Sequence, residues 1–263
     1  MRSNHALRRR AGFAALYVSG KLVGSGRWRA FQATTSHGKP TGVRLRGVTK
    51  RLEHKLFSAG ALPSIARRAD PKPGGHWKGP NGGRNRGAKV DAQLTRLINA
   101  GPSAWKNVAH VYVLTRIVLT ALRERGLEPV VAQRVVLSEA HRIGTAADIV
   151  CYSASQNRLV VVELKCGHDH GRKASATLHG RACAMRAPFS KVSDCVVHRH
   201  LAQLAVTREL LLRETALLTK LAELGVGVAV DGLLLYANDE GAEFFALDTW
   251  WQKRSAKLLA TLA

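Results

Sequence analysis

The chain has 263 residues, a formal net charge of +23 and a hydrophobic fraction of 46%. This length is sufficient for one sizeable α/β domain with an extension. The sequence contains no run of 18 apolar residues, no G-x-S-x-G and no G-x-x-x-x-G-K-[ST]. A transmembrane helix, a nucleophile-elbow hydrolase and a phosphate-loop enzyme are therefore not indicated.

The positive charge is concentrated in the N-terminal third of the chain. Residues 1–90 hold 20 of the 41 lysines and arginines but only two acids, Glu53 and Asp70. The stretch 71–84 is rich in Gly and Pro, cannot build a core and is typical of a linker. We therefore predict a basic, disordered or targeting extension over residues 1–85, followed by a folded domain over residues 86–263.

Three interpretations of this extension remain open. In the first, it binds nucleic acid by neutralising phosphates, with Trp28 and Trp77 available for base stacking. In the second, it is a mitochondrial transit peptide, because residues 1–52 are rich in Arg, include Ser and Thr, and contain no acid. In the third, it is an inert, solvated tail.

Apolar patterning predicts the elements of the folded part in chain order. We expect helices at 87–99 and 104–125, strands at 130–137, 145–152 and 159–165, a loop with a possible helix over 166–190, a helix at 194–224, strands at 228–236 and 243–247 around a turn at 238–241, and a helix at 249–262. This order favours an α/β fold with a mixed sheet covered by helices. Both faces of the central hairpin are apolar, which predicts helices on both sides of it.

Two acids and a lysine interrupt the apolar strands of this hairpin. If the hairpin is symmetric about the loop 153–158, Asp148 lies directly opposite Glu163, with Cβ atoms about 5 Å apart. Side chains alternate along a strand, so Lys165 lies on the same face as Glu163. The spacing therefore predicts two carboxylates and an ammonium at one place.

Charged groups in buried strands are unfavourable unless they are paired or bind a metal. Two carboxylates at this separation repel each other, and a divalent cation relieves that repulsion. Mg²⁺, or Mn²⁺ in its place, suits one or two carboxylates completed by water and substrate phosphate. The alternative is a buried Lys–Glu pair with Asp148 capping a turn, which leaves unexplained why three charges replace hydrophobic residues.

At these residues the chain resembles the PD-(D/E)xK nuclease superfamily, especially its RecB-like and lambda-exonuclease-like branches. The shared pattern is G-T-x-x-D-(I/V)-V, which begins here at Gly144, then a hairpin, then E-L-K. The resemblance implies a restriction-endonuclease-like fold and a Mg²⁺- or Mn²⁺-dependent nuclease. It implies that Asp148, Glu163 and the Leu164 carbonyl bind the metal, and that Lys165 positions the attacking water and helps it lose a proton.

Two further positions match the family in part. RecB-like enzymes carry Q-x-x-x-Y on a helix, and this chain has Gln203 with Thr207 in place of the tyrosine. Gln203 is expected to bond the lysine or a phosphate; the alternative is a solvated helix face. Asp91 stands where a G-x-x-x-H helix would place its histidine, so it is a candidate third ligand. The alternative is an ordinary acid in the first turn of a helix. Glu139 is a weaker candidate, expected in a loop.

Basic residues near the predicted site are candidates for nucleic-acid contacts. Arg172 and Lys173 lie in the polar loop after the hairpin, and Arg84 and Arg86 precede the helix that carries Asp91. The same loop contains His168, Asp169 and His170, which with His179 and Cys183 could bind zinc, but no recognised spacing supports such a site.

The four cysteines are Cys151, Cys166, Cys183 and Cys195, and they have no C-x-x-C spacing. This indicates a reduced, intracellular protein rather than a disulfide framework; in a eukaryote the nucleus or the mitochondrion is expected. Some RecB-like relatives hold an iron–sulfur cluster through four cysteines, but the spacing here does not match, so none is predicted.

The sequence thus predicts a metal-dependent nuclease that acts in replication, recombination or repair. Its expected partner is nucleic acid, with DNA favoured over RNA, and no membrane association is expected. The first alternative is a non-catalytic nucleic-acid-binding protein that keeps the nuclease fold. The second is a basic structural protein in which the motif is accidental.

Overall fold

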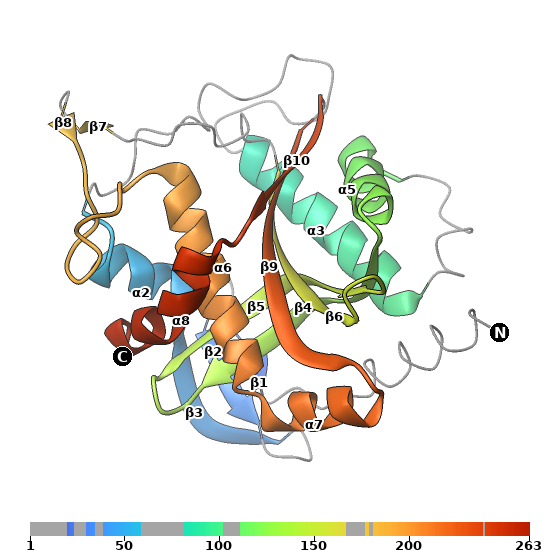
Figure 1. The fold of residues 1–263 in the computed structure, drawn as a ribbon, viewed down its shortest axis with the longest axis horizontal. Helices are drawn as coiled ribbons and strands as arrows, with labels where there is room; N and C mark the ends of the chain where they lie inside the picture. The colour runs from blue at the N-terminus through green and yellow to red at the C-terminus, as the bar shows by residue number, and fades with distance from the viewer. Residues whose placement is uncertain are drawn as a thin grey trace.

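The computed structural model describes residues 20–23, 30–34, 39–58, 82–101, 111–166, 177–178, 181–238 and 240–263. Within them the protein is an α/β fold, with a mixed sheet flanked by helices (Figure 1). The strands are β1 (Gly20–Val23), β2 (Ala30–Thr34), β3 (Pro40–Gly47), β4 (Leu127–Ser138), β5 (Ile143–Ser153), β6 (Arg158–Cys166), β7 (Thr177–Leu178), β8 (Arg181–Ala182), β9 (Gly227–Asn238) and β10 (Gly241–Ala246). The helices are α2 (Val48–Lys55), α3 (Gly82–Ala100), α5 (Val113–Glu124), α6 (Val196–Leu212), α7 (Thr215–Glu223) and α8 (Thr249–Thr261).

The main sheet has eight strands in the order β1-β2-β3-β5-β6-β9-β10, with β4 paired to the other edge of β5. The hairpin β5–β6 is antiparallel, and Tyr152 pairs with Leu159 and Val150 with Val161. This register is the one predicted from symmetry about the loop. β6 then pairs in parallel with β9, whose connection runs through α6 and α7. The central hairpin therefore lies inside the sheet.

Two hydrophobic cores cover the two faces of this hairpin. Val150 and Val161 belong to the core beneath α2, α6, α7 and α8. Ile149 and Val162 belong to the core beneath α3 and α5. Figure 1 shows α6 and α8 on one side of the sheet and α3 and α5 on the other. The prediction of helices on both sides is confirmed.

The folded part of the chain begins before residue 85, which corrects the predicted extension over residues 1–85. β3 pairs in parallel with the start of β5, and α2 packs beneath α6. Val48, Leu52 and Leu56 are each almost completely buried. They recur every four residues, so they form one apolar stripe on a helix whose other positions are mostly basic or polar.

The predicted helix over 194–224 is two helices, α6 and α7. The helical path stops after Leu212 and resumes at Thr215. At the break, Glu214 forms an ion pair of 2.6 Å with Arg134 on β4. The change of direction lets Leu217 reach the core that α6 also covers.

Other boundaries agree with the sequence to within a few residues, with two qualifications. The predicted helix at 104–125 is described from residue 113 as α5, because residues 102–110 lie outside the described residues. In the described part of 166–190, β7 and β8 form a short ladder and no helix occurs. The turn after Asn238 is as predicted, and the Asn238 Oδ1 accepts hydrogen bonds from the amides of Glu240 and Gly241. No helix in the described ranges is long and apolar enough to cross a bilayer.

Candidate active site

Asp148 lies where β5 changes its neighbour in the sheet. At the start of β5, Gly144 pairs with Gly47 of β3. The ladder to β6 begins only at Ile149, which pairs with Val162. Between these two ladders the carboxylate of Asp148 supplies a partner for the backbone, because its Oδ2 accepts the Leu164 amide at 2.8 Å. The sheet therefore forks at Asp148.

The two faces of β5 also exchange at this residue. Ile149 packs in the core beneath α3 and α5, whereas Ala147 packs in the core beneath α6. Residues two apart in a regular strand face the same side, so the alternation reverses at Asp148. As a result, the carboxylate contacts both neighbouring strands, β6 through Leu164 and β4 through Gln133. Neither the fork nor the reversal follows from the sequence pattern.

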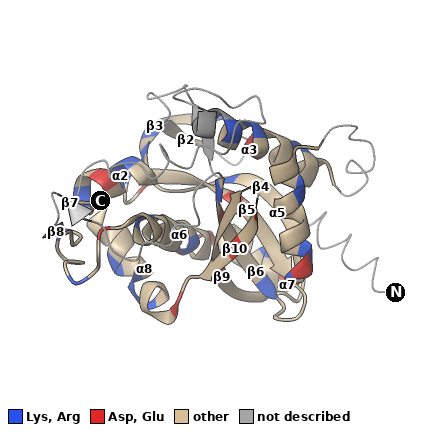
Figure 2. Ribbon diagram, turned by 90° about the horizontal axis from the view of Figure 1, so that it is seen from above, with Lys and Arg blue, Asp and Glu red and all other residues tan. Residues whose placement is uncertain are grey.

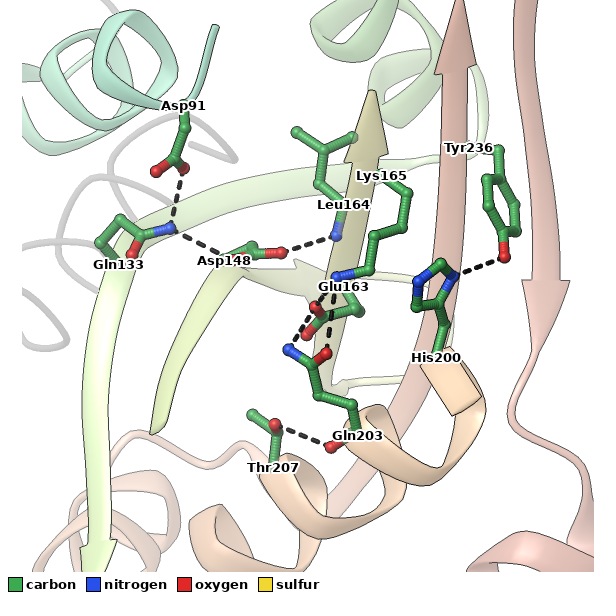
Figure 3. A network of polar contacts seen from close by, with 10 residues as sticks. All are labelled: Asp91, Gln133, Asp148, Glu163, Leu164, Lys165, His200, Gln203, Thr207 and Tyr236. Carbon is green, nitrogen blue, oxygen red and sulfur yellow. Dashed lines mark hydrogen bonds and ion pairs between the residues drawn. The ribbon is translucent and has the colours of Figure 1, made fainter. Parts of the chain in front are cut away.

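Glu163, Lys165 and Gln203 form a compact polar cluster beside Asp148 (Figure 3). Glu163 is 1% exposed, and its Oε1 accepts a hydrogen bond of 2.6 Å from the Lys165 ammonium. The same oxygen accepts a hydrogen bond of 2.6 Å from the Gln203 amide nitrogen. The Lys165 ammonium lies 3.5 Å from the Gln203 Oε1. The predicted shared face of Glu163 and Lys165 is confirmed, and the structure places Gln203 of α6 against both of them rather than on a solvated helix face.

Two carboxyl groups share one ammonium in this cluster. Burial, followed by the nearby Asp148 carboxylate, raises the pKa of Glu163 to about 8 against the opposing effect of Lys165. Burial lowers the pKa of Lys165, but the carboxylates of Glu163 and Asp148 outweigh it and the pKa is raised above the ordinary value. Burial and Asp148 therefore disfavour a second negative charge at Glu163, and an added cation would favour the ionised form of this acid.

The donor set fits Mg²⁺ or Mn²⁺. Asp148 and Glu163 supply two carboxylates at one end of the hairpin, and Mg²⁺ is typically held by one or two carboxylates with water and phosphate completing the shell. A larger site does not occur in the described ranges, where no three His, Cys, Asp or Glu side chains are grouped closely enough to hold a metal ion. The Leu164 carbonyl stays a predicted ligand; the amide of that residue bonds Asp148.

Asp91 reaches this site from α3, on the opposite side of the sheet from Gln203. The Gln133 amide nitrogen donates to the Asp91 Oδ1 at 2.8 Å and to the Asp148 Oδ1 at 3.2 Å. Asp91 is thus joined to the cluster through Gln133. In the sequence, the only sign of Gln133 is that it lies with Arg134 inside a largely apolar strand.

Tyr236 and His200 form a polar pair next to Lys165. Tyr236 of β9 is the ladder partner of Lys165, and its hydroxyl lies 2.7 Å from the His200 Nδ1. His200 stands one helical turn before Gln203 on α6, so both side chains approach the same end of β6 (Figure 3). The spacing of three residues puts His200 and Gln203 on one face of α6, whereas the sequence pattern gives no signal for Tyr236.

The other predicted site residues lie as follows. Arg86 is 2% exposed, so in this structure its guanidinium is buried rather than displayed to solvent. It is close enough to Cys166 to lower the pKa of that thiol, although burial and the Asp148 carboxylate raise it overall to about 12. Glu139 is an exposed turn residue between β4 and β5, as expected. The side chain of Arg84, the residues Arg172 and Lys173, and the loop histidines 168, 170 and 179 lie outside the described residues.

A scan against protein-family models and a search for similar curated proteins gave no match to this chain. The chemical role of the cluster therefore depends on its own geometry. Two neighbouring carboxyl groups, Asp148 and Glu163, can hold a divalent cation next to the Lys165 ammonium, which the Gln203 amide supports.

Proposed function

We propose that this protein is a metal-dependent nuclease of the PD-(D/E)xK type that hydrolyses phosphodiester bonds of DNA. The observation that carries the proposal is the meeting of Asp148 and Glu163 at the fork of the sheet, with Lys165 2.6 Å from Glu163. The restriction-endonuclease-like character of the fold is part of the same proposal. It is supported by a mixed sheet whose central hairpin carries the site and is covered by helices on both faces.

Each side chain has a distinct role in this mechanism. Asp148 and Glu163 would hold the cation, which when bound would supply positive charge to polarise the scissile phosphate and to acidify the attacking water. Lys165, kept protonated by the two carboxylates, donates to the oxygens on which negative charge develops during attack. Gln203 bonds both Glu163 and Lys165 and so holds the ammonium at a fixed place relative to the carboxylates.

Basic residues on the surrounding elements support nucleic acid as the substrate. β3 and α2 border the fork and α3 carries Asp91, and Figure 2 shows Lys and Arg on all three elements. Among the side chains that the structure describes on them, the exposed lysines and arginines are Arg44, Arg46, Lys50, Lys55, Lys89 and Arg96. Such groups bind phosphates without regard to sequence and release counterions. The overall charge of +23 has the same sign. This positive surface also favours the second candidate, a protein that binds nucleic acid without cleaving it.

The decisive experiment is a digestion assay with metal-stripped, full-length protein. Its substrates are end-labelled linear duplex, covalently closed circular duplex and single-stranded DNA, together with RNA of the same sequence. Each is incubated with Mg²⁺, Mn²⁺ or chelator. Asp148→Asn is the test variant. Asp231→Asn is the matched control, because Asp231 is also on the sheet but pairs with Arg158 at the far end of the hairpin.

We expect cleavage of DNA by the wild type and the control only when metal is present. Asp148→Asn should lose at least about 10²-fold in rate while DNA affinity, followed by fluorescence anisotropy in chelator, is retained. Cleavage of the circular duplex would identify an endonuclease, and cleavage of linear DNA alone an exonuclease. A wild type that binds DNA but cleaves no substrate would overturn the proposal in favour of the binding protein.

A further inference from the structure

Gln133 has an unusual backbone for its position in the sheet. It lies inside β4 with φ of +53°, in the left-handed backbone region that residues other than Gly and Asn seldom adopt. Arg142 and Asn157 also have positive φ, but both lie in turns, where such values are common. A left-handed residue within a strand is unfavourable and persists only where the surroundings enforce it.

The consequence of this backbone is a reversal of β4 that matches the reversal of β5. Ala132 packs in the core beneath α3 and α5, while Arg134, two residues later, reaches Glu214 between α6 and α7. Ala132 pairs with Ile149 and Arg134 with Ala147, so Gln133 stands opposite Asp148. The two strands therefore change faces at the same place, and the side chains of Gln133 and Asp148 meet there.

The contacts of the Gln133 amide define its orientation. Its nitrogen lies 2.8 Å from one oxygen of Asp91 and 3.2 Å from one oxygen of Asp148. An amide carries two N–H groups on nitrogen and only acceptors on oxygen, so nitrogen is the atom that can face two carboxylates. With the Leu164 amide on the other oxygen, Asp148 is held from both neighbouring strands.

We infer that Gln133 is a positioning residue that fixes the Asp148 carboxylate for the divalent cation, and that Asp91 acts through Gln133 rather than as a ligand of that cation. This inference rests on the proposed function. Asp91 sets which end of the amide faces Asp148, and the amide in turn sets the direction of the carboxylate. Groups that hydrogen-bond to a metal-binding carboxylate typically change metal affinity by about 10–100-fold when removed.

A purely structural role makes a different prediction. Glycine adopts a positive φ readily, so Gln133→Gly relieves the backbone strain while it removes the amide. If Gln133 only shaped the strand, this variant would bind metal like the wild type. If it positions Asp148, the variant folds normally and binds metal weakly.

The experiment is a titration of full-length, metal-stripped protein with Mn²⁺, followed by the electron paramagnetic resonance signal of free Mn²⁺. The variants are Gln133→Gly, Asp91→Asn and the double variant, with Asp148→Asn as the reference for loss of a ligand. Gln156→Gly, in the turn at the other end of the hairpin, is the matched control. Unfolding temperatures are measured in chelator. Asp91→Asn leaves the backbone at residue 133 unchanged and carries the test on its own if the glycine variant does not fold.

We expect Gln133→Gly and Asp91→Asn each to weaken Mn²⁺ binding by about 10–100-fold, with unfolding temperatures in chelator no lower than that of the wild type. The double variant should be no weaker than the weaker single variant, because Asp91 acts only through the Gln133 amide, which the glycine substitution removes. Gln156→Gly should bind as the wild type does.

Three results would overturn the inference. Binding by Gln133→Gly within about threefold of the wild type, when Asp148→Asn has lost it, would remove the positioning role and leave the proposed function intact. Additive losses in the double variant would make Asp91 a ligand in its own right. A wild type that binds no Mn²⁺ would defeat the proposed function together with the inference.

Discussion

The two ends of the β5–β6 hairpin use the same two strands in opposite ways. At the turn end, Tyr152 and Leu159 are buried and pair with each other in the ladder, and the Tyr152 hydroxyl donates to the Asn157 side chain at 2.8 Å. At the open end the ladder stops, and Asp148 and Glu163 bring two carboxylates into a buried setting. The turn end follows the rules of a stable strand pair, whereas the open end breaks several of them within a few residues.

This contrast indicates where the chain carries its chemistry. Buried charge, a raised pKa, a missing ladder and a left-handed Gln133 each oppose stability, and they coincide at the open end. Such local conflicts concentrate at functional sites. The asymmetry predicts that changes at the open end affect activity more than stability, and that changes at the turn end do the reverse.

The largest difference between the effect on activity and the effect on stability is expected at Lys165. Lys165→Ala removes the ammonium but keeps both carboxylates, so turnover should fall by about 10²–10⁴-fold while the site still binds Mn²⁺. Single-turnover cleavage at saturating protein measures the loss. Lys220→Ala is the control, since Lys220 forms an exposed pair with Glu223 on α7. Cleavage by Lys165→Ala within about threefold of the wild type would remove Lys165 from the mechanism.

A substitution at the turn end should instead lower stability and leave activity unchanged. Leu159 is 1% exposed, so Leu159→Ala should lower the free energy of unfolding by about 2–5 kcal/mol through lost burial and a cavity. Cleavage per folded molecule should be unchanged. Urea denaturation gives the stability, and Leu164→Ala, at a half-buried position of the open end, should lose less. An activity defect in folded Leu159→Ala would show that the two ends are not separable.

A smaller effect is expected in the pH dependence of the metal-free protein. The pKa of Glu163 is raised from 4.5 to about 8 on folding, so its proton is bound more tightly in the folded state. Its contribution to stability is therefore complete below 4.5 and is lost as pH rises through about 8. Glu163→Gln, which resembles the protonated acid, should gain stability relative to the wild type between pH 5 and 8.5, as measured by urea denaturation in chelator. A constant difference across that range would contradict the raised pKa.

The sequence predicted the hairpin correctly for a physical reason. The loop 153–158 is rich in turn residues and is flanked by two apolar runs. Symmetry about this loop gives the register in which Val150 pairs with Val161, as the structure has it. Extended by one residue, that register predicts Asp148 opposite Glu163, but the ladder ends at Ile149 and Val162, and the Asp148 carboxylate accepts the Leu164 amide instead. The helical spacing also brought Gln203 to the right face of α6.

Other features could not be predicted in the same way. The apolar stripe of α2 is present in the sequence, but the surrounding basic residues obscured it and residues 1–85 were assigned to an extension. The fork at Asp148 and the reversal at Gln133 depend on β3, β4 and β6 meeting β5, which are contacts between distant segments. Local patterning carries no signal for them. The link from Asp91 to Asp148 is of the same kind.

Under the proposed function, the open end of the hairpin is unfavourable by itself and a divalent cation completes it. The most direct measurement is the change in unfolding temperature at pH 7 when Mg²⁺ is added to metal-stripped wild type and to Glu163→Gln. At a Mg²⁺ concentration of about 100 times Kd, the wild type should gain about 2.7 kcal/mol, or roughly 5–10 °C for a chain of this size. Glu163→Gln should be at least as stable as the wild type in chelator and should respond little to Mg²⁺. An equal rise in both proteins, or no rise in the wild type, would contradict the claim.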